Sequence, residues 1–510
     1  MCGIAGFCNF KEDFEENTDY WNFRLEKMRA VLAHRGNDAR GRFLKKHIGL
    51  SHSRLAIRDI LCGDQPMTRT HNGYDYTICY NGEIYNTDEL IPELSENGFV
   101  CSTTSDTEVI LYAYIHWGAD FVNRLNGIFA FAIWDAAENR LLLYRDRVGV
   151  KPLFYAIRGD SLVFGSEPKA CFAHPAVKPE LDKQGLQELL AIGPAHTSGL
   201  SLFKDLFEVL PGHFMIYSRD GLHDETYWEL TSREHTESYR DTVAHTRFLV
   251  EDAIKRQMVS DVPVCTFLSG GIDSSIVTAI AANYMNTRGK TLNTFSFDFK
   301  DNDRYFKANA FQPERDLPYV NRMLEEYETA HSYLECDENS LFKALFAAVD
   351  AKDMPGMTDV DSSLLYFCSL VSRKNKVALT GECADEIFGG YPWFYRKELL
   401  ERYGFPWSSD VAPRLALLRN DVGFELDLSG YQAFRYEESR SKAPLLYGEA
   451  GEDESRRIIG YLNIKWFMQT LLDRMDRTSM YSELEARVPF ADHRIIEYVF
   501  NVPWHMKYQN

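Results

Sequence analysis

The apolar residues of this 510-residue chain follow two different rhythms, one before and one after a polar stretch near the middle. From about Ser51 to Ser218, short apolar segments such as "YDYTICYNGEIYN" and "PLFYAIRGDSLVFGSE" alternate with polar positions and turn clusters, which predicts antiparallel hairpins. After the polar "ELTSREHTESYRD", apolar runs such as "VPVCTFL" and "KVALTG" alternate with helical segments such as "SSIVTAIAANYM". This second rhythm is typical of a parallel sheet flanked by helices. We therefore expect two domains of different architecture.

The composition is that of an ordinary globular protein and excludes several classes of partner. With 45% hydrophobic residues, the chain can bury large cores. Its formal net charge of -19 argues against general binding to nucleic acid or to an anionic membrane, because such surfaces need a basic excess. The longest apolar runs, such as "IFAFAIW", are far shorter than the roughly 18 residues of a membrane helix. Scattered cysteines and the absence of any N-x-S/T sequon favour a reducing cytoplasm.

The first motif, "MCGIAGF", places a thiol directly behind the initiator methionine. Removal of Met1 would make Cys2 the first residue, so that a sulfur nucleophile and a basic α-amine would belong to the same residue. The alternative is structural, because a free cysteine in an apolar segment usually packs as a small buried hydrophobe. Position alone is a weak catalytic signal and does not decide between them.

The second motif, "FLSGGIDSS" at Phe267 to Ser275, lies between an expected buried strand and an expected helix. Two adjacent glycines allow successive N–H groups to point one way, and the start of the helix favours anions, so the turn can cradle phosphate. A turn that merely connects strand and helix is equally compatible with this spacing. The motif lacks the GxxxxGK[ST] order of a P-loop, and Phe267 stands at the first glycine position of a GxSxG elbow.

The third motif is "LTGECADEIFGGY", where another expected strand runs into a glycine turn followed by acidic residues. Glu382, Asp385 and Glu386 crowd negative charge at the end of a parallel strand, where open sheets bind ligands. Such crowding requires a cation or a raised pKa. The alternative is the solvated start of a helix, which attracts acidic residues for electrostatic reasons.

Taken together, ten ordered segments resemble the glutamine-dependent asparagine synthetases, over nearly the whole chain. These segments are "MCGIAGF", "HRGNDARG", "SHSRLAI", "YNGEIYN", "SDTEVIL", "RLNGIFAFAIWD", "RDRVGVKPLFY", "LSGGIDSS", "TGECADEIFGGY" and "EARVPFADHR". The resemblance implies an α+β and α/β protein of two domains. A class II glutamine amidotransferase of the Ntn-type αββα sandwich, with antiparallel sheets, is expected at 1–222, and a linker at 223–240. An ATP-pyrophosphatase-type α/β domain with a parallel sheet and extra helices is expected at 241–510. Relatives generally continue beyond "RVPF", so a C-terminally truncated chain is expected.

For the first domain the resemblance implies a glutaminase in which the Cys2 thiolate attacks the side-chain amide of glutamine. Asn81 and Gly82 of "YNG" would stabilise the oxyanion with a side-chain amide and a backbone N–H. The forked guanidinium of Arg54 would hold the α-carboxylate of glutamine. The remaining residues implied for glutamine binding are Leu55, Ile57, Glu83 and Asp106, with Glu83 and Asp106 near the α-amine.

For the second domain the resemblance implies activation of a carboxylate by ATP, with release of pyrophosphate and formation of an acyl-adenylate. Ammonia would then displace AMP, with Glu382 as the base for that step. Mg²⁺ would be shared by Asp273 and Asp385, because carboxylates and phosphate oxygens are its usual ligands. The residues implied to hold ATP or pyrophosphate are Leu268, Ser269, Gly270, Gly271, Asp273, Ser274, Ser275, Thr380, Gly381 and Arg477. Because ammonia protonates readily in water, an apolar passage between the two sites is expected.

Three features depart from the usual family pattern. Arg477 stands where aligning backwards from "EARVPF" places the lysine that relatives are presumed to use for pyrophosphate. Cys383 replaces a glycine that is common in the acidic motif. The segment 298–316 is longer and more irregular than usual, so adenine contacts are not transferred to it.

The resemblance leaves the acceptor carboxylate open. Aspartate, giving asparagine, is the leading expectation, and the alternatives are another carboxylate acceptor or a non-catalytic relative that senses glutamine. Cys2 favours delivery of ammonia over intramolecular ring closure, which does not need a glutaminase. The resemblance is also compatible with a homodimer.

Overall fold

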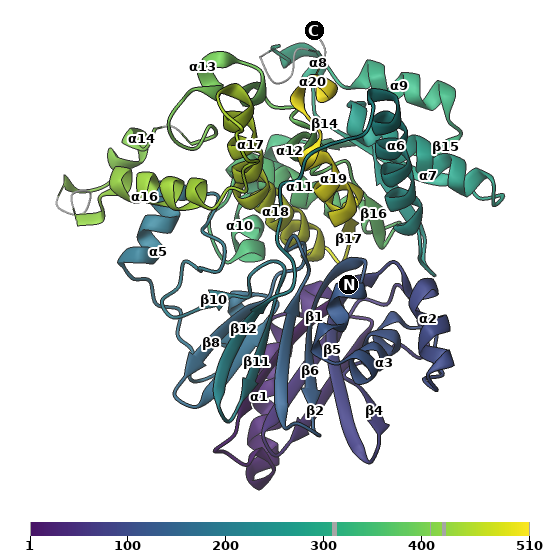
Figure 1. The fold of residues 1–510 in the computed structure, drawn as a ribbon, viewed down its shortest axis with the longest axis vertical. Coiled ribbons are helices and arrows are strands. Elements are labelled where there is room, and N and C mark those ends of the chain that lie inside the picture. The colour runs from purple at the N-terminus through teal and green to yellow at the C-terminus, as the bar shows by residue number, and fades with distance from the viewer. Residues whose placement is uncertain (1, 309–313, 409, 421–424, 509–510) are drawn as a thin grey trace.

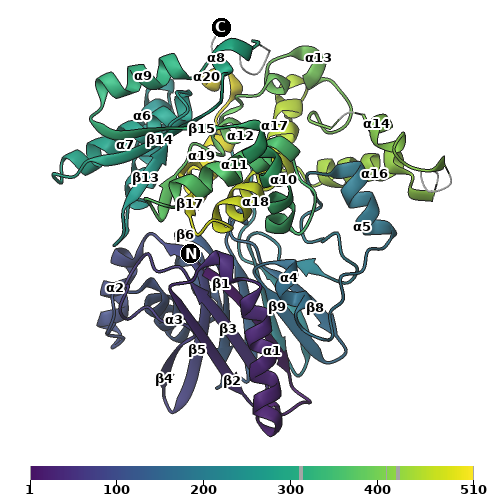
Figure 2. The ribbon, with the colours of Figure 1, turned by 180° about the vertical axis from the view of Figure 1, so that it is seen from behind.

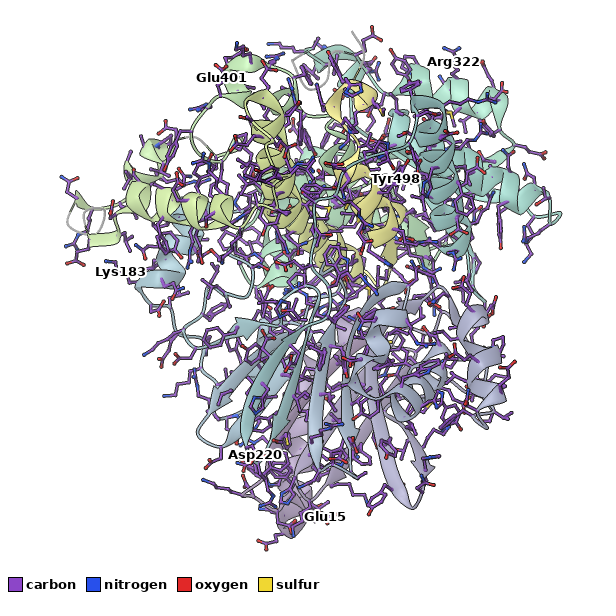
Figure 3. All side chains as sticks on the ribbon, in the orientation of Figure 1. Glu15, Lys183, Asp220, Arg322, Glu401 and Tyr498 are labelled. Carbon is purple, nitrogen blue, oxygen red and sulfur yellow. The ribbon has the colours of Figure 1, made fainter. Side chains whose placement is uncertain are left out.

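The fold was analysed in a computed structural model, which describes residues 2–308, 314–408, 410–420 and 425–508. The chain forms two stacked halves, a sheet-rich half built from the first part of the sequence and a helix-rich half built from the rest (Figure 1). The same division is seen from behind (Figure 2). The labelled charged side chains Glu15, Lys183, Asp220, Arg322 and Glu401 project from the periphery (Figure 3).

The first half is a four-layered αββα sandwich of two antiparallel sheets. One sheet has the order β10 (Phe207–Glu208), β8 (Phe154–Arg158), β9 (Ser161–Gly165), β1 (Cys2–Asn9), β3 (Ile48–Arg54) and β2 (Ala39–Lys45). The other has the order β12 (Gly221–Thr226), β11 (His213–Ser218), β7 (Arg140–Arg145), β6 (Gly127–Asp135), β5 (Tyr74–Ile84) and β4 (Met67–His71). The outer faces carry α1 (Thr18–Ala30) and α4 (Pro168–Phe172) on the first sheet, and α2 (Thr87–Glu96) and α3 (Asp106–Trp117) on the second.

The sandwich explains why the apolar runs of this half are continuous rather than strictly alternating. Along β6, Ala130 and Ala132 face the core between the two sheets, whereas Phe129 and Phe131 face the outer helices. A strand covered on both faces buries every side chain, so the period of two disappears. The expected antiparallel sandwich is confirmed.

The second half contains a five-stranded parallel sheet. Its strands are, in order, β15 (Thr329–Cys336), β14 (Leu292–Phe299), β13 (Val264–Phe267), β16 (Val377–Leu379) and β17 (Glu485–Arg487). The longer helices around it are α6 (Tyr239–Arg256), α7 (Ile272–Asn286), α9 (Leu317–Glu326), α10 (Glu338–Lys352), α11 (Thr358–Val371), α16 (Leu428–Ser441), α17 (Glu452–Leu462), α18 (Met468–Met480) and α19 (His493–Asn501). The expected parallel α/β sheet with extra helices is confirmed.

The short elements of this half are α8 (Asn302–Tyr305), α12 (Ala384–Phe388), α13 (Lys397–Leu400), α14 (Ala412–Leu415) and α20 (Trp504–Lys507). α5 (Lys183–Gln187) comes from the first half and lies beside α16, where Gln187 Nε2 donates to the Leu426 carbonyl. Within the described ranges, no helix is both long and apolar enough to cross a membrane.

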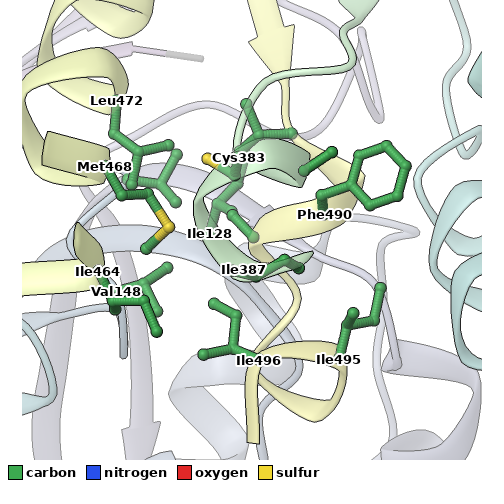
Figure 4. Packing of buried hydrophobic residues seen from close by; sticks show 14 of the residues in the cluster. Ile128, Val148, Cys383, Ile387, Ile464, Met468, Leu472, Phe490, Ile495 and Ile496 are labelled. Atoms are coloured by element: carbon green, nitrogen blue, oxygen red, sulfur yellow. The ribbon is translucent and has the colours of Figure 1, made fainter. Parts of the chain in front are cut away.

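A single apolar cluster joins the two halves. Ile128 and Val148 of the sandwich pack in the same cluster as Met468, Leu472 and Ile496 of the second half (Figure 4).

A second contact between the halves is ionic and fully buried. Arg35 Nη1 lies 2.9 Å from Glu167 Oε1 and 2.9 Å from Asp476 Oδ2, and Lys151 Nζ lies 2.9 Å from Asp476 Oδ1. Charges this deeply buried fix the relative orientation of the halves, because a shift that separated them would leave each unpaired.

Candidate functional site

The first candidate site surrounds Cys2 at the start of β1. Cys2 is opposite Arg54 in the β1–β3 pair and is 7% exposed. Its backbone N–H donates to Asn81 Oδ1 at 2.9 Å, which brings β5 of the other sheet to the same point. Burial raises the pKa of the Cys2 thiol, while the Leu55 backbone N–H and the Arg54 guanidinium oppose that rise. The thiol therefore needs a nearby base before it can act as a nucleophile.

The side-chain amide of Asn81 supplies a buried hydrogen-bond donor beside Cys2. Its side chain is fully buried, and its Nδ2 has no hydrogen-bond partner among the described residues. Leaving such a donor unpaired costs roughly 1–3 kcal/mol, a cost that a bound oxygen would remove. The next residue has no room for a side chain, because a Cβ on Gly82 would lie 2.2 Å from the Ile128 carbonyl oxygen. Both features suit a preformed oxyanion site beside Cys2.

Arg54 is held in place by the loop that follows it. Its Nη1 donates to Asp64 Oδ1 at 2.9 Å and to the Ile60 carbonyl at 3.2 Å, and its Nη2 donates to the Asp59 carbonyl at 2.5 Å. Gly63 permits this approach, because a Cβ there would lie 2.4 Å from Arg54 Nη2. Since Asp64 is 75% exposed at its side chain, a ligand carboxylate can replace it at little cost.

Leu55 and Ile57, both predicted to bind glutamine, place their side chains away from the Cys2 thiol. Both side chains belong to the apolar cluster between the two halves. The Ile57 carbonyl accepts from the Asp261 N–H at 3.0 Å. The Leu55 backbone N–H, in contrast, faces the Cys2 thiol. Leu55 is therefore placed to act through its backbone, while its side chain seals the interface.

Glu83 and Asp106 bring two carboxylates to the same site. Glu83 Oε1 lies 3.3 Å from Arg58 Nη1, and Glu83 Oε2 lies 3.3 Å from Arg487 Nη2 of the second half. Burial and the nearby Asp106 raise the pKa of Glu83 to about 8, and Arg487 and Arg58 oppose the rise. Asp106 begins α3, and its Oδ2 accepts from Tyr80 Oη at 2.8 Å. The two arginines were missed in the sequence because neither lies in a motif assigned to glutamine.

The second candidate site lies at the carboxyl ends of β13 and β16. In the loop after β13, Ser269 N–H donates to Ser274 Oγ at 3.2 Å, and Ser274 Oγ donates to the Gly271 carbonyl at 3.1 Å. Gly270 has a φ of 82° and tolerates no side chain, since a Cβ would lie 2.7 Å from Tyr319 Cβ. These bonds hold the turn in a fixed shape at the start of α7, where anions are favoured.

The other residues predicted to hold ATP or pyrophosphate lie in different environments. Leu268 is buried, and its N–H donates to the Phe295 carbonyl. Ser275 N–H closes the first turn of α7 on the Gly271 carbonyl. Thr380 N–H donates to the Arg487 carbonyl at 3.0 Å, and a Cβ on Gly381 would lie 2.8 Å from the Ser274 nitrogen. The expected phosphate turn and acidic turn therefore touch.

Asp273 and Asp385 bring two partly buried carboxylates together. Burial and Asp385 raise the pKa of Asp273 to about 7, and burial and Glu382 raise the pKa of Asp385. In the described parts of the chain, no hydrogen bond or ion pair reaches either carboxylate, and no cluster of three or more His, Cys, Asp or Glu residues could hold a metal. Two carboxylates fit Mg²⁺ when substrate phosphates and water supply the other oxygens.

Glu382 points at an arginine that the sequence analysis did not select. Arg474 Nη2 donates to Glu382 Oε1 at 2.8 Å. Arg474 lies on α18, and its buried Nε has no hydrogen-bond partner among the residues that the structure describes. Next to Glu382, Cys383 adopts a φ of 78°, the left-handed region where glycine is favoured, and its side chain joins the interdomain cluster. Packing of this thiol compensates for the backbone strain that the usual glycine avoids.

Arg477, predicted to hold pyrophosphate, has its guanidinium at the interface between the two halves. Its guanidinium is 1% exposed, donates to the Ala351 carbonyl and to Asp353 Oδ2 at 2.9 Å, and lies 3.6 Å from Glu167 of the first half. These partners lie at the interface between the two halves and not in the loops that follow β13 and β16. Arg474, one helical turn earlier, is the α18 residue that reaches Glu382. Its signal in the sequence was a second arginine three residues before the one that the alignment selected.

We expect replacement of Arg474 by methionine to slow the ATP-dependent half-reaction by roughly 10- to 100-fold, because Glu382 then has no cation partner in a partly buried site. Pyrophosphate release with ammonia as nitrogen source measures this step. Arg474→Lys, which keeps the charge, should lose less. An unchanged rate in Arg474→Met would show that this pair is only structural.

A cavity of about 410 Å³ adjoins the phosphate turn, at the carboxyl ends of β13, β14 and β15. It is lined by Ser269 and by residues of the segment 298–316 for which no adenine contact was predicted, among them Asp298, Asn302 and Arg315. Part of that segment, 309–313, lies outside the described residues. The cavity continues from the phosphate turn and has the size of a nucleoside site.

Comparison with known proteins gives two family matches that divide the chain. Residues 1–228 match the family described as glutamine amidotransferase domain, and residues 245–510 match the family described as asparagine synthase. The chain is 49% identical over 508 residues to asparagine synthetase [glutamine-hydrolyzing] 3 of Bacillus subtilis, which covers 99% of this chain and 82% of the relative. It is 29% identical over 572 residues to amidase chyE of Penicillium rubens, covering 99% of this chain and 83% of that relative.

Among solved structures, the glutamine phosphoribosylpyrophosphate amidotransferase of Bacillus subtilis is similar with a TM-score of 0.33 and 17% sequence identity. That similarity covers 61% of this chain and 69% of the other.

Proposed function

Because the chain belongs to the family of glutamine-hydrolysing asparagine synthetases, we propose that it converts aspartate to asparagine with ATP and with nitrogen taken from glutamine. The observation that carries the proposal is the presence of two preformed sites in one chain. One has a thiol beside an unpaired amide donor. The other has a phosphate turn beside unpaired carboxylates. The division at 1–222, 223–240 and 241–510 is part of this proposal.

In the glutaminase site, the Cys2 thiolate attacks the side-chain carbonyl carbon of glutamine once Met1 has been removed. The α-amine of Cys2 takes the thiol proton and passes it to the leaving nitrogen, which departs as ammonia. The oxyanion of the tetrahedral intermediate accepts from Asn81 Nδ2 and the Gly82 N–H. Water then hydrolyses the thioester, and glutamate leaves.

Recognition of glutamine is divided between its two charged groups. Arg54, preorganised by its loop, exchanges the exposed Asp64 for the α-carboxylate of the ligand. Glu83 and Asp106 accept from the α-ammonium group. Binding of the ammonium favours ionised Glu83, so it acts against the raised pKa of that carboxyl.

In the synthetase site, backbone and hydroxyl groups of Ser269, Gly270, Gly271 and Ser274 hold the phosphates of ATP, and the adjoining cavity takes the nucleoside. Asp273 and Asp385 would hold Mg²⁺, which neutralises phosphate charge when bound. The β-carboxylate of aspartate attacks the α-phosphorus, so that pyrophosphate leaves and β-aspartyl-AMP remains.

Ammonia then attacks the β-carbonyl carbon, Glu382 accepts a proton, and AMP departs. The nitrogen has to cross from Cys2 to this carbonyl without meeting bulk water. The apolar cluster between the two halves, which includes Leu55, Ile57, Ile128 and Val148, supports a passage along the interface.

Incubation of the protein with glutamine, ATP, Mg²⁺ and single candidate acids tests the proposal. Asparagine and pyrophosphate formed in equal amounts, and only with aspartate, are the expected products. AMP release with another acid and not with aspartate would assign a different acceptor. Failure to release glutamate from glutamine would instead point to a glutamine sensor.

We also propose that the protein works in the cytoplasm and as a homodimer. All ten cysteines are free in the structure, which suits a reducing compartment. Light scattering in solution measures the oligomeric state.

A further inference from the structure

A strand of the second half reaches into the glutaminase site. β17 carries Glu485 and Arg487 on one face, and both side chains are fully buried. Arg487 Nη2 lies 3.3 Å from Glu83 Oε2, across the interface. Glu83 and Arg487 are 404 residues apart in the sequence, and the docking of the two halves brings them together.

The Arg487 guanidinium is held on its other sides by its own half. Its Nε donates to Glu485 Oε1 at 2.5 Å, and its Nη1 donates to the carbonyls of Gln257 at 2.7 Å and Val259 at 2.5 Å. These three bonds fix the orientation of the fork. The remaining N–H groups of Nη2 are thereby aimed at Glu83, with little side-chain entropy left to lose.

The backbone of Arg487 belongs to the synthetase site. Arg487 pairs with Leu379 in the β16–β17 ladder, and its carbonyl accepts from the N–H of Thr380. Thr380 stands two residues before Glu382, and Glu83 stands two residues after Asn81. A single residue therefore connects the acidic turn of one site with the oxyanion turn of the other.

We propose that Arg487 is a positioning residue for the glutaminase, and that by holding Glu83 it allows the synthetase half to complete the glutamine pocket. The inference rests on the proposed function. A pocket completed by the second half would bind glutamine well only when β16 and β17 are correctly seated. Such an arrangement links glutamine capture to the integrity of the site that consumes the ammonia.

Electrostatics supports the same assignment. Glu83 is faced by the carboxylates of Asp106 and Glu485 and by the cations of Arg58 and Arg487. Burial and these carboxylates favour protonated Glu83, whereas the α-ammonium group of glutamine requires the ionised form. Removing Arg487 takes away a cation that stabilises ionised Glu83, while Arg58 remains, and so moves the titration of Glu83 to higher pH.

The test compares Arg487→Met with Arg487→Lys by following glutamate release from glutamine in the absence of ATP. We expect KM for glutamine to rise about tenfold or more in Arg487→Met, with kcat within about threefold of the wild type. Arg487→Lys keeps a charge but loses the fork, so KM should rise less. Because the pKa of Glu83 is raised to about 8, we expect KM for glutamine to fall as pH rises through that pKa, and we expect this transition to lie at higher pH in Arg487→Met.

Two controls separate positioning from stability. Arg494→Met removes an arginine that pairs with Asp492 and Asp252 inside the second half, so it should leave KM for glutamine unchanged. In the double variant of Arg487→Met and Glu83→Gln, KM should be close to that of Glu83→Gln alone, because both act on the same carboxylate.

An unchanged KM and pH profile in folded Arg487→Met would overturn the inference, as would an equal rise of KM in the Arg494→Met control. If Arg487→Met does not fold, Arg487→Lys decides alone: an increased KM at constant kcat supports the inference, and an unchanged KM contradicts it. A wild-type protein without glutaminase activity would be a failure of the proposed function and not of this inference.

Discussion

Cys2→Ala is expected to lower glutamine-dependent asparagine formation by at least about 1,000-fold, because it removes the sulfur that forms the thioester with glutamine. The same variant should retain synthesis from ammonia within about twofold, since the phosphate turn and Glu382 are contributed by the other half of the chain. Both rates are measured as asparagine formed, with either glutamine or an ammonium salt supplied.

The matched control is Cys62→Ala, which removes an exposed thiol of the same half. It should change neither rate. The mass of the purified wild-type protein shows whether Met1 has been removed. Glutamine-fed synthesis that survives in Cys2→Ala would contradict the assignment of the nucleophile.

Asp385→Asn is expected to reduce ATP-dependent pyrophosphate release by roughly 100-fold or more while leaving glutaminase activity intact, because one of two carboxylates for Mg²⁺ is lost. The same change should stabilise the protein when Mg²⁺ is absent. Asp385 contributes to raising the pKa of Asp273 to about 7, so its removal relieves repulsion between buried acids.

The stability gained in Asp385→Asn should depend on pH, because it comes from the ionisation of Asp273. A carboxyl whose pKa is raised in the folded state contributes stability at low pH and loses it as pH rises through the folded value. Asp273 therefore costs stability progressively from about pH 4 to about pH 7, and the advantage of Asp385→Asn should be largest above pH 7. A rise in Tm of about 1–3 °C at pH 8, and little change at pH 4, is expected from scanning calorimetry.

Asp359→Asn serves as the control, because Asp359 is an exposed acid on α11. It should alter neither pyrophosphate release nor Tm. Full activity in Asp385→Asn would contradict the assignment of Asp385 to Mg²⁺. A lower Tm at pH 8 without Mg²⁺ would show that Asp273 and Asp385 do not destabilise the protein by repulsion.

The architecture of both halves could be predicted from the sequence because it depends on local period. Alternation in "YDYTICYNGEIYN" specified a strand, now β5, and the apolar runs "VPVCTFL" and "KVALTG" specified β13 and β16. The two glycine turns follow these strands directly, so the rule that ligands bind at the carboxyl ends of parallel strands was enough to place them together. The contact of Gly381 with the Ser274 backbone agrees with that placement.

The side-chain partners of the predicted site residues could not be read from the sequence, and the reason is the same in each case. Arg477 was selected by its spacing from "EARVPF", yet its guanidinium lies in the interdomain ion network and Arg474 faces Glu382. Leu55 and Ile57 were assigned to glutamine, yet their side chains pack between the halves. In each case the decisive neighbour comes from a distant segment, and spacing along one helix or strand carries no information about it.

By itself, the sequence determined the two architectures, the order of the motifs and the chemistry that each turn can perform, since these follow from backbone period, glycine placement and residue type. Only the tertiary structure decided which charges meet. Glu83 and Arg487 are brought together by the docking of one half against the other, as are Glu167 and Arg477. The physical reason is that buried charges must find partners wherever packing places them, and packing is a property of the whole chain.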